Sequence, residues 1–263
     1  MKKIILVLGL FLVMISTSAC HKLAYQFDID KEGNLSISET QAINLNAMSD
    51  FMADMTKGMT QTPKEAEVKE QIAKSFEKNK EETRKELETE GYEVEDYNDG
   101  TFNGLTKTKN YNINNFKLSN LPKGFIVESR PFVLIKEETT GKTYSIDMKY
   151  DFSVAADDTQ AGKQGYSPAI KNQQPLSPST EKAMEAFLPI AELTIKTPTK
   201  ATKHNATEVI NENEYKWKLA LDSPTKIELE YKIADYSTIM IIFSLVFLGI
   251  FLLVAYNKLK NDG

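Results

Sequence analysis

A long apolar run near the C-terminus constrains the fold of this chain most. Residues 239–255 carry no charge and are dominated by Ile, Leu, Phe and Val, and with their neighbours the run 237–256 reaches about 20 residues, enough to cross a bilayer as a helix. Tyr236 and Tyr256 bracket the run, as interfacial aromatic residues do, and lysines follow it. The sequence therefore predicts a transmembrane helix at 237–256 and a cytoplasmic tail at 257–263, with the rest of the chain outside.

The N-terminus has the organisation of a secretory signal, 1–19: two lysines, an apolar block and small polar residues lead up to Cys20. Ser18-Ala19-Cys20 resembles the lipobox of bacterial lipoproteins, although Thr17 stands where most lipoboxes have Leu. Cys20 is the only cysteine, so no intrachain disulfide can form. We expect lipidation of Cys20, with ordinary cleavage after Ala19 or an uncleaved anchor as the alternatives.

The segment between the two ends, 20–233, has the composition of a globular extracellular domain. Hydrophobic residues make up 41% of the chain, and the net charge of −5 gives no basic face for nucleic acid. Residues 155–206 are mostly polar and suggest an insertion or linker. Elsewhere, alternating or helical spacing of apolar residues predicts the following elements: strands at 23–29 and 35–39 in a hairpin, a short helix at 46–59, a long helix at 63–90, a β-meander from 92 to 150, and a hairpin of 215–221 with 227–231.

Two of these elements carry more specific signals. Thr62 and Pro63 suit the start of the long helix, and Gly91 suits its C-terminal cap. The apolar stripe of this helix does not sustain a heptad, so docking on a sheet is favoured over a coiled coil. Trp217 is the only tryptophan, and its alternating neighbours predict a core position rather than a ligand-stacking one.

Residues 28–39 match the twelve-residue calcium-loop pattern. The oxygen donors at its ligand positions are Asp28, Asp30, Glu32, Ser36 and Glu39. The alternating strand pattern before Asp28 leaves no room for an entering helix, and a hairpin turn uses the same residue types. We therefore expect a turn and no metal, with calcium as the alternative.

No enzyme signature is present. The two histidines, His21 and His204, lie beside the expected anchor and in a polar loop, and the sequence has no Gly-rich phosphate loop, zinc-binding helix or nucleophile elbow. The abundant carboxylates follow helical i,i+4 pairing with lysines, typical of a solvated surface. We expect a non-enzyme without a cofactor.

The signal, the lipobox-like Cys20, the last hairpin and the terminal apolar run together resemble the LppM-like family of bacterial membrane lipoproteins. The resemblance implies an α+β domain of helix-grip or START-like type, in which a curved antiparallel sheet packs on a long helix and can enclose an apolar ligand. Two features depart from that family: the length of the predicted helix 63–90, and the polar region 155–206.

Two functions follow from these expectations. The first is a cell-surface lipoprotein whose outer domain binds a lipid or another apolar envelope molecule. The second is a non-catalytic assembly protein that binds a membrane-proximal protein partner through the long helix. In both, the bilayer holds the two ends of the outer domain at the same membrane face.

Overall fold

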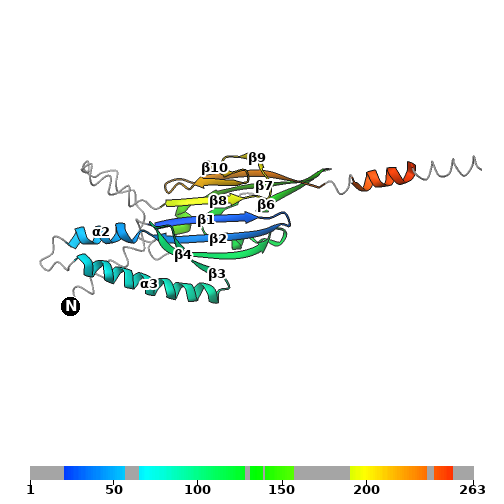
Figure 1. Ribbon diagram of the computed structural model, residues 1–263. Coiled ribbons are helices and arrows are strands. Elements are labelled where there is room, and N and C mark those ends of the chain that lie inside the picture. The colour runs from blue at the N-terminus through cyan, green and yellow to red at the C-terminus, as the bar shows by residue number, and fades with distance from the viewer. Residues whose placement is uncertain are drawn as a thin grey trace, which may run out of the picture.

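Two β-sheets face each other and form the body of the molecule (Figure 1). The computed structural model describes residues 21–56, 65–127, 131–138, 140–156, 190–235 and 240–250. The predicted signal 1–19, Cys20, most of the polar region 155–206 and the tail 257–263 therefore lie outside the described residues.

The first sheet has seven strands in the order β10-β11-β8-β1-β2-β4-β3. Their bounds are β1 His21–Ile29, β2 Asn34–Ile43, β3 Glu93–Asn98, β4 Asn103–Asn112, β8 Ile190–Lys196, β10 Glu208–Asn211 and β11 Glu214–Lys218. The predicted hairpin of the first two strands is confirmed, with Ile29 opposite Leu35 next to its turn. On its other side β1 pairs in parallel with β8, a strand that lies about 160 residues further along the chain.

The second sheet has five strands: four follow the order β5-β7-β12-β9, and the fifth, β6, also pairs with β7. Their bounds are β5 Phe125–Ile126, β6 Val133–Glu138, β7 Gly141–Tyr150, β9 Ala201–His204 and β12 Thr225–Ala234. Two 3-10 turns, Ile113–Asn115 and Leu118–Asn120, connect β4 to this sheet, and a short helix, α4 (Phe152–Ala156), follows β7.

The hydrophobic core lies between the two sheets. Tyr25 and Phe27 on β1 meet aromatic residues of the second layer: Phe125 lies 4.9 Å from the Tyr25 ring and 5.3 Å from the Phe27 ring, centroid to centroid. Tyr150 on β7 packs 5.8 Å from Tyr25. Such edge-on and tilted aromatic pairs add to the burial of large apolar area. Trp217 is 1% exposed, which confirms its predicted core position.

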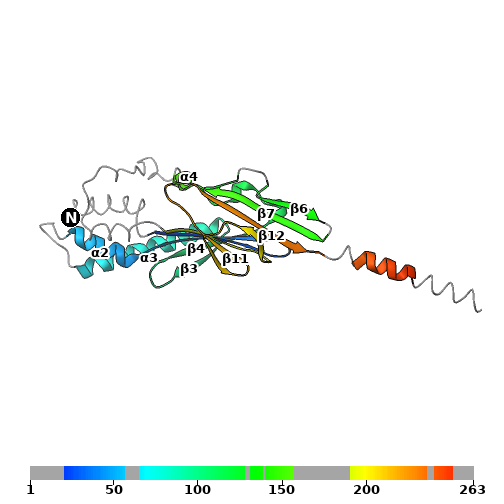
Figure 2. The same cartoon turned by 90° about the horizontal axis from the view of Figure 1, so that it is seen from above.

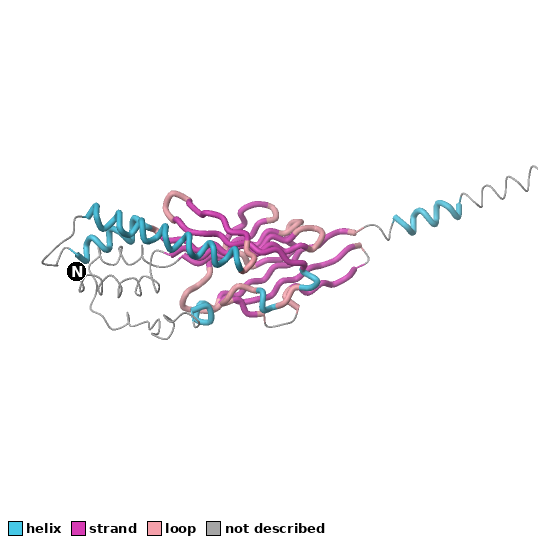
Figure 3. Tube along the Cα trace, turned by 90° about the horizontal axis from the view of Figure 1, so that it is seen from below, coloured by secondary structure: helices cyan, strands magenta, loops and turns pink. Residues whose placement is uncertain are grey.

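The expected α+β fold, one curved sheet packed on a long helix, is wrong. The long helix does form, as α3 (Glu65–Thr89), and ends at Gly91 with φ of 81°, as predicted. Among the described residues, however, the core draws nothing from α3 or from α2 (Leu45–Thr56), and strand dominates the domain (Figure 3). The apolar stripe of α3 is too narrow to build a core layer, and its members Ile72 and Phe76 stay half-buried.

Polar contacts join α3 to β3, the edge strand of the first sheet. Arg84 donates to the carbonyl oxygen of Val94 at 3.0 Å and pairs with Asp96 of β3 at 2.8 Å. Lys80 reaches the same carboxylate at 3.3 Å. Ion pairs of this exposed kind contribute little stability, so α3 is attached to the sheet pair rather than enclosed by it.

The predicted hairpin of 215–221 with 227–231 is also wrong. β11 pairs with β8 and β10 in the first sheet, whereas β12 pairs with β7 and β9 in the second. The chain crosses between the layers through the turn that contains Pro224. Both strands alternate apolar and polar residues, and that pattern identifies a half-buried strand without identifying its neighbour.

None of the helices that the structure describes is both long and apolar enough to cross a bilayer. Of the run 237–256, residues 240–250 are described, as a helix, while 237–239 and 251–256 lie outside the described residues.

Candidate functional site

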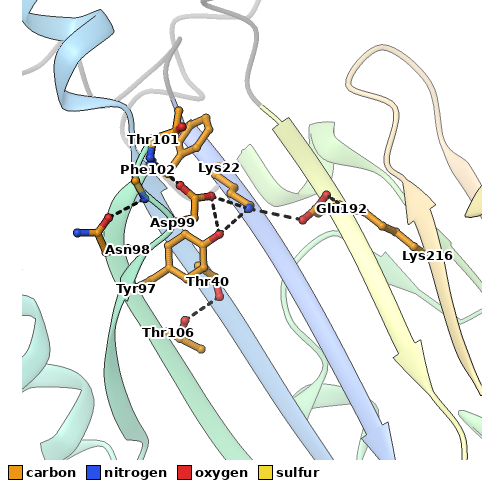
Figure 4. A network of polar contacts seen from close by, with 11 residues as sticks. Lys22, Thr40, Tyr97, Asn98, Asp99, Thr101, Phe102, Thr106, Glu192 and Lys216 are labelled. Carbon is orange, nitrogen blue, oxygen red and sulfur yellow. Dashed lines mark hydrogen bonds and ion pairs between the residues drawn. The ribbon is translucent and has the colours of Figure 1, made fainter. Parts of the chain in front are cut away.

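A polar network covers the outer face of the first sheet where β1 begins (Figure 4). Its centre is Lys22, whose side chain is 17% exposed. The Lys22 ammonium donates to the Tyr97 hydroxyl at 2.5 Å and to Asp99 at 3.2 Å, and lies 3.9 Å from Glu192 of β8. Glu192 also pairs with Lys216 of β11 at 2.6 Å. The network thus links the first residues of β1 to strands on both sides.

Asp99 closes the turn between β3 and β4. One carboxylate oxygen accepts from the backbone amides of Phe102 at 2.7 Å and Thr101 at 3.0 Å, and the other accepts from the Tyr97 hydroxyl at 2.8 Å. These bonds, the one to Phe102 foremost, together hold the pKa of Asp99 well below its usual range, although burial acts in the opposite direction. The carboxylate is fully engaged and therefore unsuited to act as a general base.

The network also keeps the Lys22 side chain protonated. Burial alone would lower the pKa of its ammonium, but the hydrogen bonds with Tyr97 and Asp99 outweigh burial and raise it. The ammonium also lies 5.0 Å from the centre of the Tyr97 ring, within cation–π range. The network is therefore a clamp of satisfied charges, whose physical effect is to fix β1 from its second residue onward.

No local pattern in the sequence marks this network, because Lys22, Tyr97 and Glu192 are separated by up to 170 positions. The pairing of β1 with β8 brings Glu192 to Lys22, and the successive pairing of β1, β2, β4 and β3 brings Tyr97 there. Beside it, Thr40 and Thr106 share a 2.8 Å hydrogen bond that ties β2 to β4 on the same face (Figure 4). The polar surface of this face therefore extends from Lys22 to these two threonines.

A half-open cleft of about 360 Å³ lies at the opposite end of β1, between the β1–β2 turn and the end of β12. Its lining residues are Lys31, Glu32, Gly33, Ile113, Asn114, Ile135, Lys142, Tyr144, Ile233, Ala234 and Asp235. The Tyr144 ring stacks on Tyr231 at 5.0 Å, with the ring planes 3° apart. The buried Tyr231 hydroxyl has no hydrogen-bond partner among the described residues, and burial raises its pKa. The cleft combines an apolar wall with charged rim residues.

The calcium-loop residues are held in a hairpin instead of a helix–loop–helix. Asp30 accepts from the Asn34 amide at 2.8 Å and from its side chain at 2.7 Å, which is how an Asx residue closes a turn. Asp28 pairs with Lys196 at 3.3 Å, and Glu39 pairs with Lys107 at 3.1 Å. Glu32 lines the cleft.

These donors do not converge on one point. Ser36 lies opposite Asp28 in the ladder, whereas Glu39 lies opposite Tyr25, further from the turn. Across the described ranges, no cluster of three or more His, Cys, Asp or Glu side chains is placed to hold a metal ion.

Two further residues from the sequence analysis are Cys20 and Trp217. Cys20 lies outside the described residues, and the next residue, His21, begins β1. Trp217 donates from Nε1 to the Asn205 side-chain oxygen at 2.8 Å. A buried, hydrogen-bonded indole has no open face on which a ligand could stack.

Comparisons with known proteins give one distant similarity. No family model matches the chain, and no curated protein matches it. Among solved structures, the NMR structure of the folded domain of LppM from Mycobacterium tuberculosis aligns over 83% of this chain and 93% of that domain, with 11% sequence identity and a TM-score of 0.38.

Proposed function

We propose that this chain is a non-catalytic envelope protein, held at a membrane by a lipid on Cys20 and by its apolar C-terminal segment, whose two-sheet domain binds an apolar envelope molecule. The observation that carries the proposal is the exposure of helix 240–250. Large apolar side chains cover consecutive positions of this helix and are exposed by 54% at Leu248 to 77% at Phe247. Consecutive positions point to all sides of a helix, so one protein face could not cover them.

Lipid contact follows from the size of that apolar surface. Soluble monomers rarely expose a contiguous apolar patch of this kind without a partner, and membranes are a principal partner of such patches. The residues from Met240 to Ile250 include no charge and one hydroxyl, that of Ser244, which donates to the Met240 carbonyl within the helix. The side chains of this helix therefore offer no free hydrogen-bonding group to water.

The cleft is the best candidate for the bound molecule. Its volume of about 360 Å³ lies within the usual range for small-molecule sites. Ile113, Ile135 and Ile233 supply apolar surface. The charged lining residues are of both signs: Lys31 and Lys142 are cationic, and Glu32 and Asp235 are anionic. The interior between the sheets, by contrast, is filled by aromatic and aliphatic side chains, so we place the ligand in the cleft and not between the sheets.

Native mass spectrometry of the detergent-extracted protein tests the ligand. We expect a co-purifying lipid in the wild type and its loss in Ile135→Trp, which fills the cleft. Leu134→Trp is the matched control, because Leu134 is the neighbouring residue on β6 and is 58% exposed. Equal lipid content in the two variants would refute binding in the cleft.

Membrane attachment is tested separately. Metabolic labelling with a radioactive fatty acid should mark the wild type and not Cys20→Ser. The wild type should also stay with membranes after alkaline extraction, and loss of the protein into the soluble fraction would contradict the proposal.

A protein partner on α3 is the second candidate function. Ile72, Phe76 and Leu87 form a stripe that the sheets leave half-exposed. Phe76→Asp should abolish recovery of a cross-linked partner while leaving the lipid content unchanged. The exposed Lys78→Asp on the same helix is the control for charge.

A further inference from the structure

The two attachment sites leave the domain at opposite ends. β1 begins at His21, one residue after Cys20, and runs away from that end (Figure 1). β12 runs the same way: its first residue, Thr225, pairs with Tyr150, which packs near Tyr25, and its last residues line the cleft beside the β1–β2 turn. Figure 2 shows the same arrangement from above.

The chain between β12 and the apolar helix is too short to undo this separation. The nine residues of β1 span about 26 Å at roughly 3.3 Å per residue. From Asp235 to Met240 the chain has five residue steps, which reach at most about 18 Å when fully extended. A domain standing upright on Cys20 would hold Asp235 about 26 Å above the lipid, beyond that reach.

We infer that the domain lies lengthwise on a single bilayer, so that one long side of the sheet pair faces lipid. The inference rests on the proposed attachment at both ends. For helix 240–250 to reach the bilayer that holds Cys20, the β1 axis must tilt from the membrane normal by at least about 45°, since 26 Å times the cosine of the tilt must not exceed 18 Å. The cleft then opens close to the lipid surface, within reach of its head groups.

Fluorescence quenching on vesicles measures this orientation. The full, acylated chain is reconstituted in phosphatidylcholine–phosphatidylglycerol vesicles that carry a head-group nitroxide, and a fluorophore is attached to one introduced cysteine. Acylation blocks Cys20, the only natural cysteine, so labelling is specific. Thr101→Cys marks the end where β1 begins and Lys31→Cys the cleft end, while Gln26→Cys and Asp147→Cys mark the outer faces of the two sheets; all four positions are exposed.

A lengthwise domain predicts comparable quenching of the Thr101→Cys and Lys31→Cys labels, and stronger quenching of one face label than of the other. Insertion of fifteen Gly and Ser residues after Asp235 gives the chain ample extra reach, about 50 Å when extended, and should weaken quenching at Lys31→Cys and at the more strongly quenched face label, while Thr101→Cys stays quenched. Quenching at Thr101→Cys without Lys31→Cys would overturn the inference, as would clustering of vesicles, which indicates two bridged bilayers. Failure of the protein to float with the vesicles would instead refute the proposed attachment.

Discussion

Truncation of Phe27 and Phe76 distinguishes a core between two sheets from a core between a sheet and a helix. Phe27 on β1 is fully buried, with the Phe125 and Phe132 rings 5.3 and 6.1 Å away. Truncation of a buried phenylalanine to alanine costs about 3–5 kcal/mol, a large part of the stability of a typical domain. Phe76 on α3 is half-buried, so Phe76→Ala should cost about 1 kcal/mol.

The assay uses Trp217 as its reporter. This single tryptophan is 1% exposed within the core, so its fluorescence reports on opening of the sheet pair. Urea unfolding of the detergent-solubilised chain should show a much lower midpoint for Phe27→Ala than for Phe76→Ala. Phe27→Leu should lie between Phe27→Ala and the wild type, because it retains more of the buried volume. If Phe76→Ala cost as much as Phe27→Ala, α3 would be part of the core and our account of the fold would be refuted.

Three further predictions concern single groups. Because the folded-state pKa of Asp99 lies below its unfolded value, its contribution to stability is present above about pH 4 and is lost as the pH falls toward the folded pKa. The difference in urea midpoint between wild type and Asp99→Asn should therefore shrink below pH 4, and a difference independent of pH would contradict this. Tyr231→Phe removes a buried hydroxyl for which the described part of the chain supplies no partner, and should leave stability equal or raise it by up to about 1 kcal/mol in thermal unfolding; a loss would mean that the hydroxyl is satisfied. Gly104→Ala should destabilise by about 3 kcal/mol in the same assay, since the added Cβ would lie 2.0 Å from the Gln41 carbonyl oxygen, and an unchanged midpoint would refute that close approach.

Local structure could be predicted from the sequence because its signals are local. The β1–β2 hairpin follows from alternation on either side of Asp30 to Asn34, and the end of α3 follows from Gly91. The partners of each strand could not be predicted in the same way. β8 begins at Ile190, far from β1 along the chain, yet it pairs with β1 in parallel. Nothing in a two-residue periodicity chooses between such neighbours.

The candidate sites escaped prediction for the same reason. Lys22 is unremarkable in sequence until β8 pairs with β1 and sets it beside Glu192, and until β2, β4 and β3 pair in turn and bring Tyr97 to it. The cleft likewise needs Ile135, Tyr144 and Ile233 from three strands of the second sheet. The residues of the calcium pattern, by contrast, form the hairpin turn that their local composition predicted, closed through Asp30 and Asn34.

The strands that lead to the proposed attachments are interior strands of the two sheets. β1 follows Cys20 and lies between β2 and β8, while β12 leads toward helix 240–250 and lies between β7 and β9. Terminal segments fray unless neighbouring structure ties them down. Here β1 is paired along both sides, and β12 is paired with β7 over its whole length and with β9 from Leu229 to Tyr231. The Lys22 network adds a clamp at the first residues of β1. Tension between the two ends of a lengthwise domain would therefore run along two interior strands, and β1 could not peel away without opening the core around Phe27.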